Sequence, residues 1–235
     1  MINRFSALLV LFLVSAVTFA QGINQMDAAG KRHGVWKGTY EKSKKPRYEG
    51  TFDHGKETGT FKFFEDDKTS TLAATRAFAA DGSCITIFFD DKGKKVSEGK
   101  EVNKLREGEW KFYDPKTSKV LSTEPYVNGK IQGTRKVLFA NGALAEEAVY
   151  ADGVKNGVYK QYTEKGIVLE ESTYKNDKLD GPAIFRNGHG DIVSKGQFTD
   201  NKKTGKWQFF EKGKKVREED LTNKKTQLAR KERKN

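Results

Sequence analysis

Gly108-Glu109-Trp110-Lys111-Phe112-Tyr113 is the stretch that decides the fold, because close variants of it recur along the chain. Gly59-Thr60-Phe61-Lys62-Phe63-Phe64 precedes it, and Gly205-Lys206-Trp207-Gln208-Phe209-Phe210 follows it. The first residue of each such stretch is called here the anchor. The anchors follow one another every 24 or 25 residues, at Gly34, Gly59, Cys84, Gly108, Gly133, Gly157, Gly181 and Gly205. A period this strict indicates a repeat protein of about eight copies.

Large side chains recur at two positions within each copy. The residue two after the anchor, called here the ring position, is aromatic in five copies, as Trp36, Phe61, Trp110, Tyr159 and Trp207. The residue four after the anchor includes Phe63, Phe112 and Phe209. Side chains in a strand alternate between faces, so both positions share one face. We expect like residues of successive copies to stack along this face.

A second strand and polar turns complete each copy. Pairs such as Asn128-Gly129 and Asp152-Gly153 tolerate positive φ and close tight turns between strands. Two strands in each of eight copies predict an all-β fold, an elongated antiparallel sheet of β-hairpin repeats with about sixteen strands. The only candidate helix lies in the basic C-terminal tail.

The stretch from Asn103 to Tyr113, read as Asn-Lys-Leu-Arg-Glu-Gly-Glu-Trp-Lys-Phe-Tyr, resembles the signature of the MORN repeat. The similarity is to the bacterial, YwqK-like variant, and it covers residues 30–213 in about eight repeats. The resemblance implies a hairpin repeat that serves protein contacts and sometimes membrane association. It implies no catalytic residues.

The third copy departs from the pattern. Cys84 takes the place of the anchor glycine, and Thr86 stands at the ring position. The spacing is kept, so we expect this copy still to form a hairpin. The alternative is a flat patch that admits a partner. Arg135 and Ala183 at the ring position of two other copies indicate that such drift is common in this chain.

The N-terminus has the features of a signal peptide. Arg4 precedes an apolar run from Ala7 to Val14, and Thr18-Phe19-Ala20 resembles a cleavage site. We expect residues 1–20 to be removed, leaving Gln21 first; an uncleaved anchor is the alternative. No cysteine follows as a lipid attachment point, so the expected location is the periplasm or outside the cell. The remaining divisions are a lead-in over 21–29, the repeats over 30–213 and a basic tail over 214–235.

The formal net charge of +12 reflects an excess of lysine and arginine, much of it in the tail. Six basic residues there are candidates for contact with an acidic protein, an anionic lipid or an acidic polysaccharide. They are Lys224, Lys225, Arg230, Lys231, Arg233 and Lys234. A solvated, frayed tail is the alternative. Nucleic acid is not expected as a partner, because the tail lacks interleaved aromatics for stacking.

Few residues of the chain are candidates for catalysis or metal binding. The three histidines, His33, His54 and His189, stand in expected turns and have no further ligand at metal-binding spacing. Cys84, the single cysteine, has no adjacent base, which favours a buried, inert thiol. We therefore expect no catalytic, cofactor or metal site, and no enzyme.

Three non-enzymatic functions remain. The first is a protein-interaction scaffold, whose sheet surface contacts a subunit of an outer-membrane or secretion complex, for example as an accessory or plug on its periplasmic side. The second is a binder of anionic membrane or polysaccharide surfaces through the basic tail and the loop lysines. The third is a YwqK-like antitoxin, against which the signal peptide argues.

Overall fold

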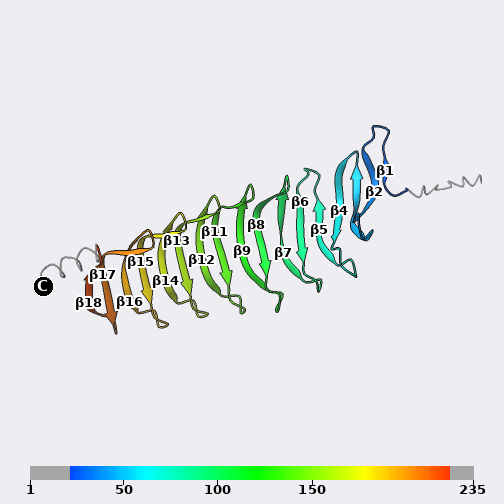
Figure 1. Ribbon diagram of the computed structural model, residues 1–235. Coiled ribbons are helices and arrows are strands. Elements are labelled where there is room, and N and C mark those ends of the chain that lie inside the picture. The colour runs from blue at the N-terminus through cyan, green and yellow to red at the C-terminus, as the bar shows by residue number, and fades with distance from the viewer. Residues whose placement is uncertain (1–21, 223–235) are drawn as a thin grey trace, which may run out of the picture.

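The computed structural model describes residues 22–222, which form one antiparallel sheet of 18 strands (Figure 1). The strands are β1 Gln25–Met26, β2 Arg32–Thr39, β3 Pro46–Asp53, β4 Lys56–Phe64, β5 Leu72–Phe78, β6 Cys84–Phe89, β7 Lys95–Val102, β8 Leu105–Tyr113, β9 Val120–Val127, β10 Lys130–Ile131, β11 Gly133–Leu138, β12 Leu144–Ala151, β13 Val154–Tyr162, β14 Val168–Lys175, β15 Lys178–Arg186, β16 Ile192–Thr199, β17 Lys202–Glu211 and β18 Lys214–Asp220.

The strands pair in chain order, so the sheet lengthens along the chain. Each strand pairs with the next, except that β10 and β11 do not pair with each other and both pair with β9. Figure 1 shows the strands side by side along one long axis, in a single twisted layer. The prediction of an elongated all-β hairpin sheet is therefore confirmed. The described residues contain no helix, and so none that is long and apolar enough to cross a membrane.

The strand number exceeds the expected sixteen because of two short strands. β1, of two residues, lies in the lead-in, and β10, also of two residues, is a detached start of β11. β18 lies within the segment that the sequence assigned to the tail, where it pairs with β17 and completes the eighth hairpin. The candidate helix and the six basic residues of the tail lie outside the described residues.

The anchor glycines belong to strands rather than turns. Their φ angles are all positive, at 74° for Gly34, 64° for Gly59, 68° for Gly108, 106° for Gly133, 136° for Gly157, 127° for Gly181 and 64° for Gly205. At Gly59, Gly108 and Gly205, the strand that holds the anchor has two more residues than the strand paired with it, so the register shifts by two residues. A glycine at positive φ permits this bulge. The bulge lets each strand continue on the N-terminal side of its anchor, so β4, β8 and β17 begin three residues before their anchor glycines, where we expected them to start.

The third copy forms its own hairpin from β6 and β7 and joins the second copy without the anchor bulge. Cys84 occupies the anchor place, and β5 pairs with β6 in one unbroken register. The two residues that a bulge would absorb go instead into a longer turn, in which the Gly82 amide donates to the Ala79 carbonyl. A side chain at positive φ is strained, so cysteine favours the regular ladder. The prediction that the copy keeps its hairpin is confirmed.

Small residues separate the rings along one face, called here the aromatic face. Gly50 lies against Phe61, Gly99 against Trp110 and Gly196 against Trp207. Like positions of successive copies are two strands, or about 9.6 Å, apart, which is too far for direct stacking. The expected ladder of like rings was therefore wrong. Rings of different positions meet instead, as in the edge-to-face contact of Phe198 with Trp207 at 5.2 Å between centroids.

Candidate interaction surface on the aromatic face

The ring-position aromatics form the local cores of the sheet. Phe61, Trp110 and Trp207 are at most 1% exposed. The other sequence-predicted large residues of this face, Trp36, Phe63, Phe112, Tyr159 and Phe209, are half-buried. Each indole also has a hydrogen-bond partner, because Nε1 of Trp110 donates to the Lys100 carbonyl at 2.9 Å and that of Trp207 to the Gln197 carbonyl at 3.1 Å. A single-layer sheet thus buries tryptophans within its own surface.

A cation covers the ring in four copies. The residue two before the anchor supplies it, with the charged group 4.1–4.8 Å from the ring centroid, in the pairs Arg32–Trp36, Arg106–Trp110, Lys155–Tyr159 and Lys203–Trp207. Such cation–π contacts also keep the aliphatic stem over apolar surface. The sequence analysis missed this pairing. The signal for it was a basic residue four positions before each of these aromatics.

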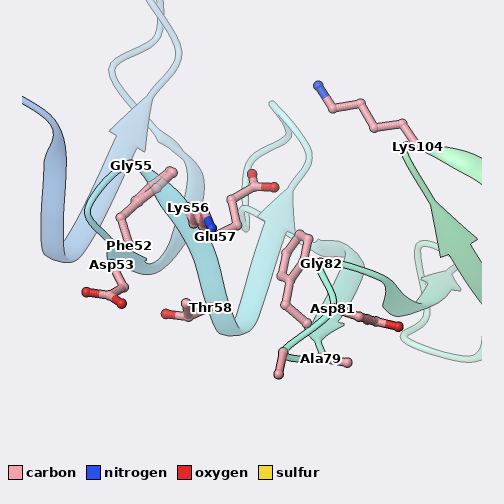
Figure 2. Close-up of a pocket in the computed structure, with 12 residues that line it drawn as sticks. Phe52, Asp53, Gly55, Lys56, Glu57, Thr58, Ala79, Asp81, Gly82 and Lys104 are labelled. Carbon is pink, nitrogen blue, oxygen red and sulfur yellow. The ribbon is translucent and has the colours of Figure 1, made fainter.

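Both members of this pair are missing from the third copy. Gly82 stands two before the anchor, and Thr86 stands at the ring position. A hollow of about 780 Å³ lies beside this copy, between β4 with its preceding turn and the β5–β6 turn (Figure 2). Phe52 and Phe78 supply its apolar lining, and Lys104 of the β7–β8 turn lines it as well. The charged residues Asp53, Lys56, Glu57, Asp81 and Lys104 line it.

A buried polar network lies next to the hollow. Glu101, 7% exposed, accepts a hydrogen bond at 2.9 Å from the hydroxyl of Thr86, which is fully buried. The guanidinium Nε of Arg76 lies 3.2 Å from the same carboxylate. In the third copy, the hydrogen-bonded side chains of Thr86 and Glu101 thus occupy the place that an aromatic ring occupies in other copies. A buried carboxylate costs stability unless it is paired, and Arg76 supplies the pairing.

Cys84 belongs to the same network, and its thiol is not activated as a nucleophile. The thiol is buried, 3.6 Å from the Thr86 hydroxyl and 3.9 Å from Glu101. Burial, opposed by the Thr86 hydrogen bond and reinforced by the Glu101 charge, raises the pKa of Cys84. The thiol therefore stays protonated at neutral pH, and the predicted buried cysteine is confirmed.

The fifth copy replaces its ring by another ion pair. Nε of Arg135 donates to Glu124 at 2.9 Å, and Tyr126 donates to the same carboxylate at 2.6 Å. Nη1 of Arg106 donates to the Tyr126 hydroxyl at 2.9 Å, which links this pair to the cation over Trp110. Here long side chains span the ring position, unlike Thr86 in the third copy.

Two histidines meet at the N-terminal end of the sheet. The β2–β3 pairing places His33 next to Asp53 and His54, and the two imidazole centroids are 4.8 Å apart. The sequence shows no second histidine near either of these two, because hairpin register brings together residues 21 positions apart. His189 lies far along the chain, in the β15–β16 turn, where its amide donates to Asn187.

Comparisons with known proteins do not identify a relative. No family model matches the chain, and no curated protein matches it. Among similar solved structures is a TarM mutant from S. aureus, in complex with fondaparinux, α-GlcNAc-glycerol and UDP. It is 20% identical with a TM-score of 0.32, and the match covers 39% of this chain and 18% of that one. A protein of unknown function from Bacteroides fragilis is 7% identical with a TM-score of 0.16, over 62% of this chain and 95% of that one. Neither similarity bears on function.

Proposed function

We propose that this protein is a non-enzymatic interaction scaffold, built from MORN-like hairpins and exported to the periplasm, and that its partner contacts the hollow beside the third copy. The observation that carries this proposal is the hollow beside the third copy, which is lined by Gly82 at the position that supplies a cation in other copies. Four copies have a cation over the aromatic at the ring position, whereas the third has Gly82 and Thr86.

The lining of the hollow fits a protein segment. Phe78, which is half-buried, offers apolar surface for an aliphatic or aromatic side chain of the partner, and the buried ring of Phe52 belongs to the same lining. Charges of both signs surround them and suit a polar rim. A subunit of an outer-membrane or secretion complex is the partner that we propose, with this chain as its periplasmic accessory or plug.

The rigidity of the third copy supports the same reading. A binding surface is most effective when it does not have to be ordered on contact. The unbroken β5–β6 ladder and the buried Glu101–Arg76 pair hold the copy in shape without a covering side chain. The hollow is thus framed by paired strands and two turns.

A truncation separates the array from the tail. A chain ending at Thr222 keeps β18, whereas a cut at Gly213 would remove a strand of the eighth hairpin. We expect the chain ending at Thr222 to capture the partner from native envelope at nearly the yield of the full chain in about 0.15 M salt, where exposed charges are screened over about 8 Å.

The opposite outcome favours the competing functions. If the truncation abolishes both partner capture and binding to anionic vesicles, the protein is a binder of anionic surfaces through its tail. Capture of a toxin in place of an envelope subunit would favour the antitoxin.

A further inference from the structure

A compact group of metal-ligand side chains lies at the N-terminal end of the sheet. His33 belongs to β2, Asp53 ends β3, and His54 opens the β3–β4 turn. One ligand atom from each of the three lies within 4.8 Å of the others. All three are at least partly exposed, so an ion could reach them from solvent.

A fourth residue orients one imidazole. Oδ2 of Asp27 lies 2.6 Å from Nδ1 of His54, and Oδ1 of Asp27 accepts the backbone amides of Ala29 and Lys31 at 2.9 and 2.8 Å. The Asp27 side chain is only 9% exposed, so the turn holds it firmly. By accepting a hydrogen bond from Nδ1 of His54, Asp27 leaves the lone pair of that ring on Nε2.

The remaining atoms are spaced almost as ligands of one ion. Oδ1 of Asp53 lies 3.6 Å from Nδ1 of His33 and 3.8 Å from Nε2 of His54. Two ligands at about 2.0–2.1 Å from a tetrahedral zinc lie about 3.3–3.4 Å apart. The three ligand atoms lie within 4.8 Å of one another, so the widest pair closes by at most about 1.5 Å to reach that spacing, through side-chain rotations of partly exposed residues. The one competing hydrogen bond at His33 Nδ1, from the His54 amide, is long at 3.5 Å.

We propose that His33, His54 and Asp53 bind a divalent transition-metal ion of the zinc class, with Asp27 as the positioning carboxylate of His54. Two imidazoles and one carboxylate are a donor set that zinc accepts, with a fourth position left for water. A carboxylate on the second nitrogen of a ligating histidine fixes its orientation and raises its basicity. The two aspartates also balance the charge of a divalent ion. The site shares Asp53 with the lining of the hollow, but it does not depend on the proposed partner function.

Calorimetric titration of Zn²⁺ into the untagged chain, from Gln21 to Asn235, tests the site. We expect one ion per chain. His54→Ala and His33→Ala should abolish this binding, and Asp27→Asn should weaken it about 10–100-fold while all three ligands remain. The matched control is His189→Ala, which removes a histidine from a turn elsewhere and should leave the affinity unchanged.

Circular dichroism checks that each variant is folded, which is expected because both histidines are partly exposed and Asp27→Asn keeps the size of the side chain. A wild-type chain that takes up no Zn²⁺ would overturn the proposal. So would uptake by the folded His54→Ala variant at wild-type affinity, which would place the ion elsewhere.

Discussion

The eighth and third copies follow the same repeat pattern but have different kinds of side chain at the ring position. In the eighth, Trp207 is fully buried against Gly196 and under the ammonium group of Lys203. In the third, Thr86 is equally buried but is held by the Glu101 carboxylate. Both copies continue the same ladder of strands, so the sheet does not depend on an aromatic in every copy. The ring provides apolar burial, and in the third copy the hydrogen bond between Thr86 and Glu101 takes its place.

The largest effect is expected from removing a buried ring. Trp207→Ala and Trp110→Ala should each lower the free energy of unfolding by about 3–5 kcal/mol, because each leaves a cavity in a closely packed site. Trp36→Ala should cost less, since that ring is half-buried, in the first copy, and meets Phe52 edge-to-face. Chemical denaturation of the three variants measures the difference. Equal shifts would mean that ring burial does not decide stability.

The third copy should be sensitive to charge instead. Glu101→Gln keeps the size of the side chain but removes the ion pair with Arg76. Hydrogen bonds to charged groups contribute about 1.5–3 kcal/mol, and we expect a loss of that order. Glu218→Gln is the control, because Glu218 forms ion pairs at the exposed edge strand. A loss no greater than that of the control would show that the network is not structural.

The site of Trp207 should be intolerant of a methyl group at Gly196, which lies on the neighbouring strand β16. A Cβ there would lie well inside the van der Waals distance of the Trp207 ring, so Gly196→Ala should cost about 1–3 kcal/mol by overpacking. Gly188→Ala is the matched control, because a Cβ at Gly188 meets nothing within 4 Å. Thermal unfolding of both variants provides the comparison, and equal melting temperatures would contradict the packing described for Trp207.

The smallest effect is expected at alkaline pH. Burial, followed by the charges of Glu146 and Glu170, raises the pKa of Tyr159 from 10.0 to about 12. Between these values the unfolded chain loses the phenol proton and the folded chain keeps it, so stability falls as pH rises. Tyr159→Phe should make that fall shallower in denaturation series from pH 9 upward, a range set by the ordinary tyrosine pKa of about 10. An unchanged slope would mean that Tyr159 ionises normally.

The regular copies were largely readable from sequence because their period fixes both register and face. Trp110 and its equivalents could be assigned to a strand from spacing alone, and the Asn-Gly turns were recognised from their positive φ requirement. Stacking of like rings was misjudged because the intervening strand was not counted. Glycine at the anchor was identified as a marker, although its function in a bulge became clear only from the pairing.

The irregular parts could not be read in the same way. The Glu101–Arg76 pair joins residues 25 positions apart, and nothing in either residue identifies the other as its partner. The His33–His54 cluster depends on one hairpin register, and Asp27 reaches it from the lead-in. Side-chain pairs between residues far apart in the sequence can be identified only from the three-dimensional structure, whereas a repeated period can be read from the sequence.

The central claim, that a partner docks beside the third copy, is tested most directly by site-specific photo-crosslinking in the native host. A photoreactive amino acid replaces either Thr58, which lines the hollow, or Thr204, its equivalent one residue before the anchor of the eighth copy. We expect a discrete envelope-protein adduct from position 58 and none from position 204. Equal adducts from both positions, or an adduct from 204 alone, would contradict the account.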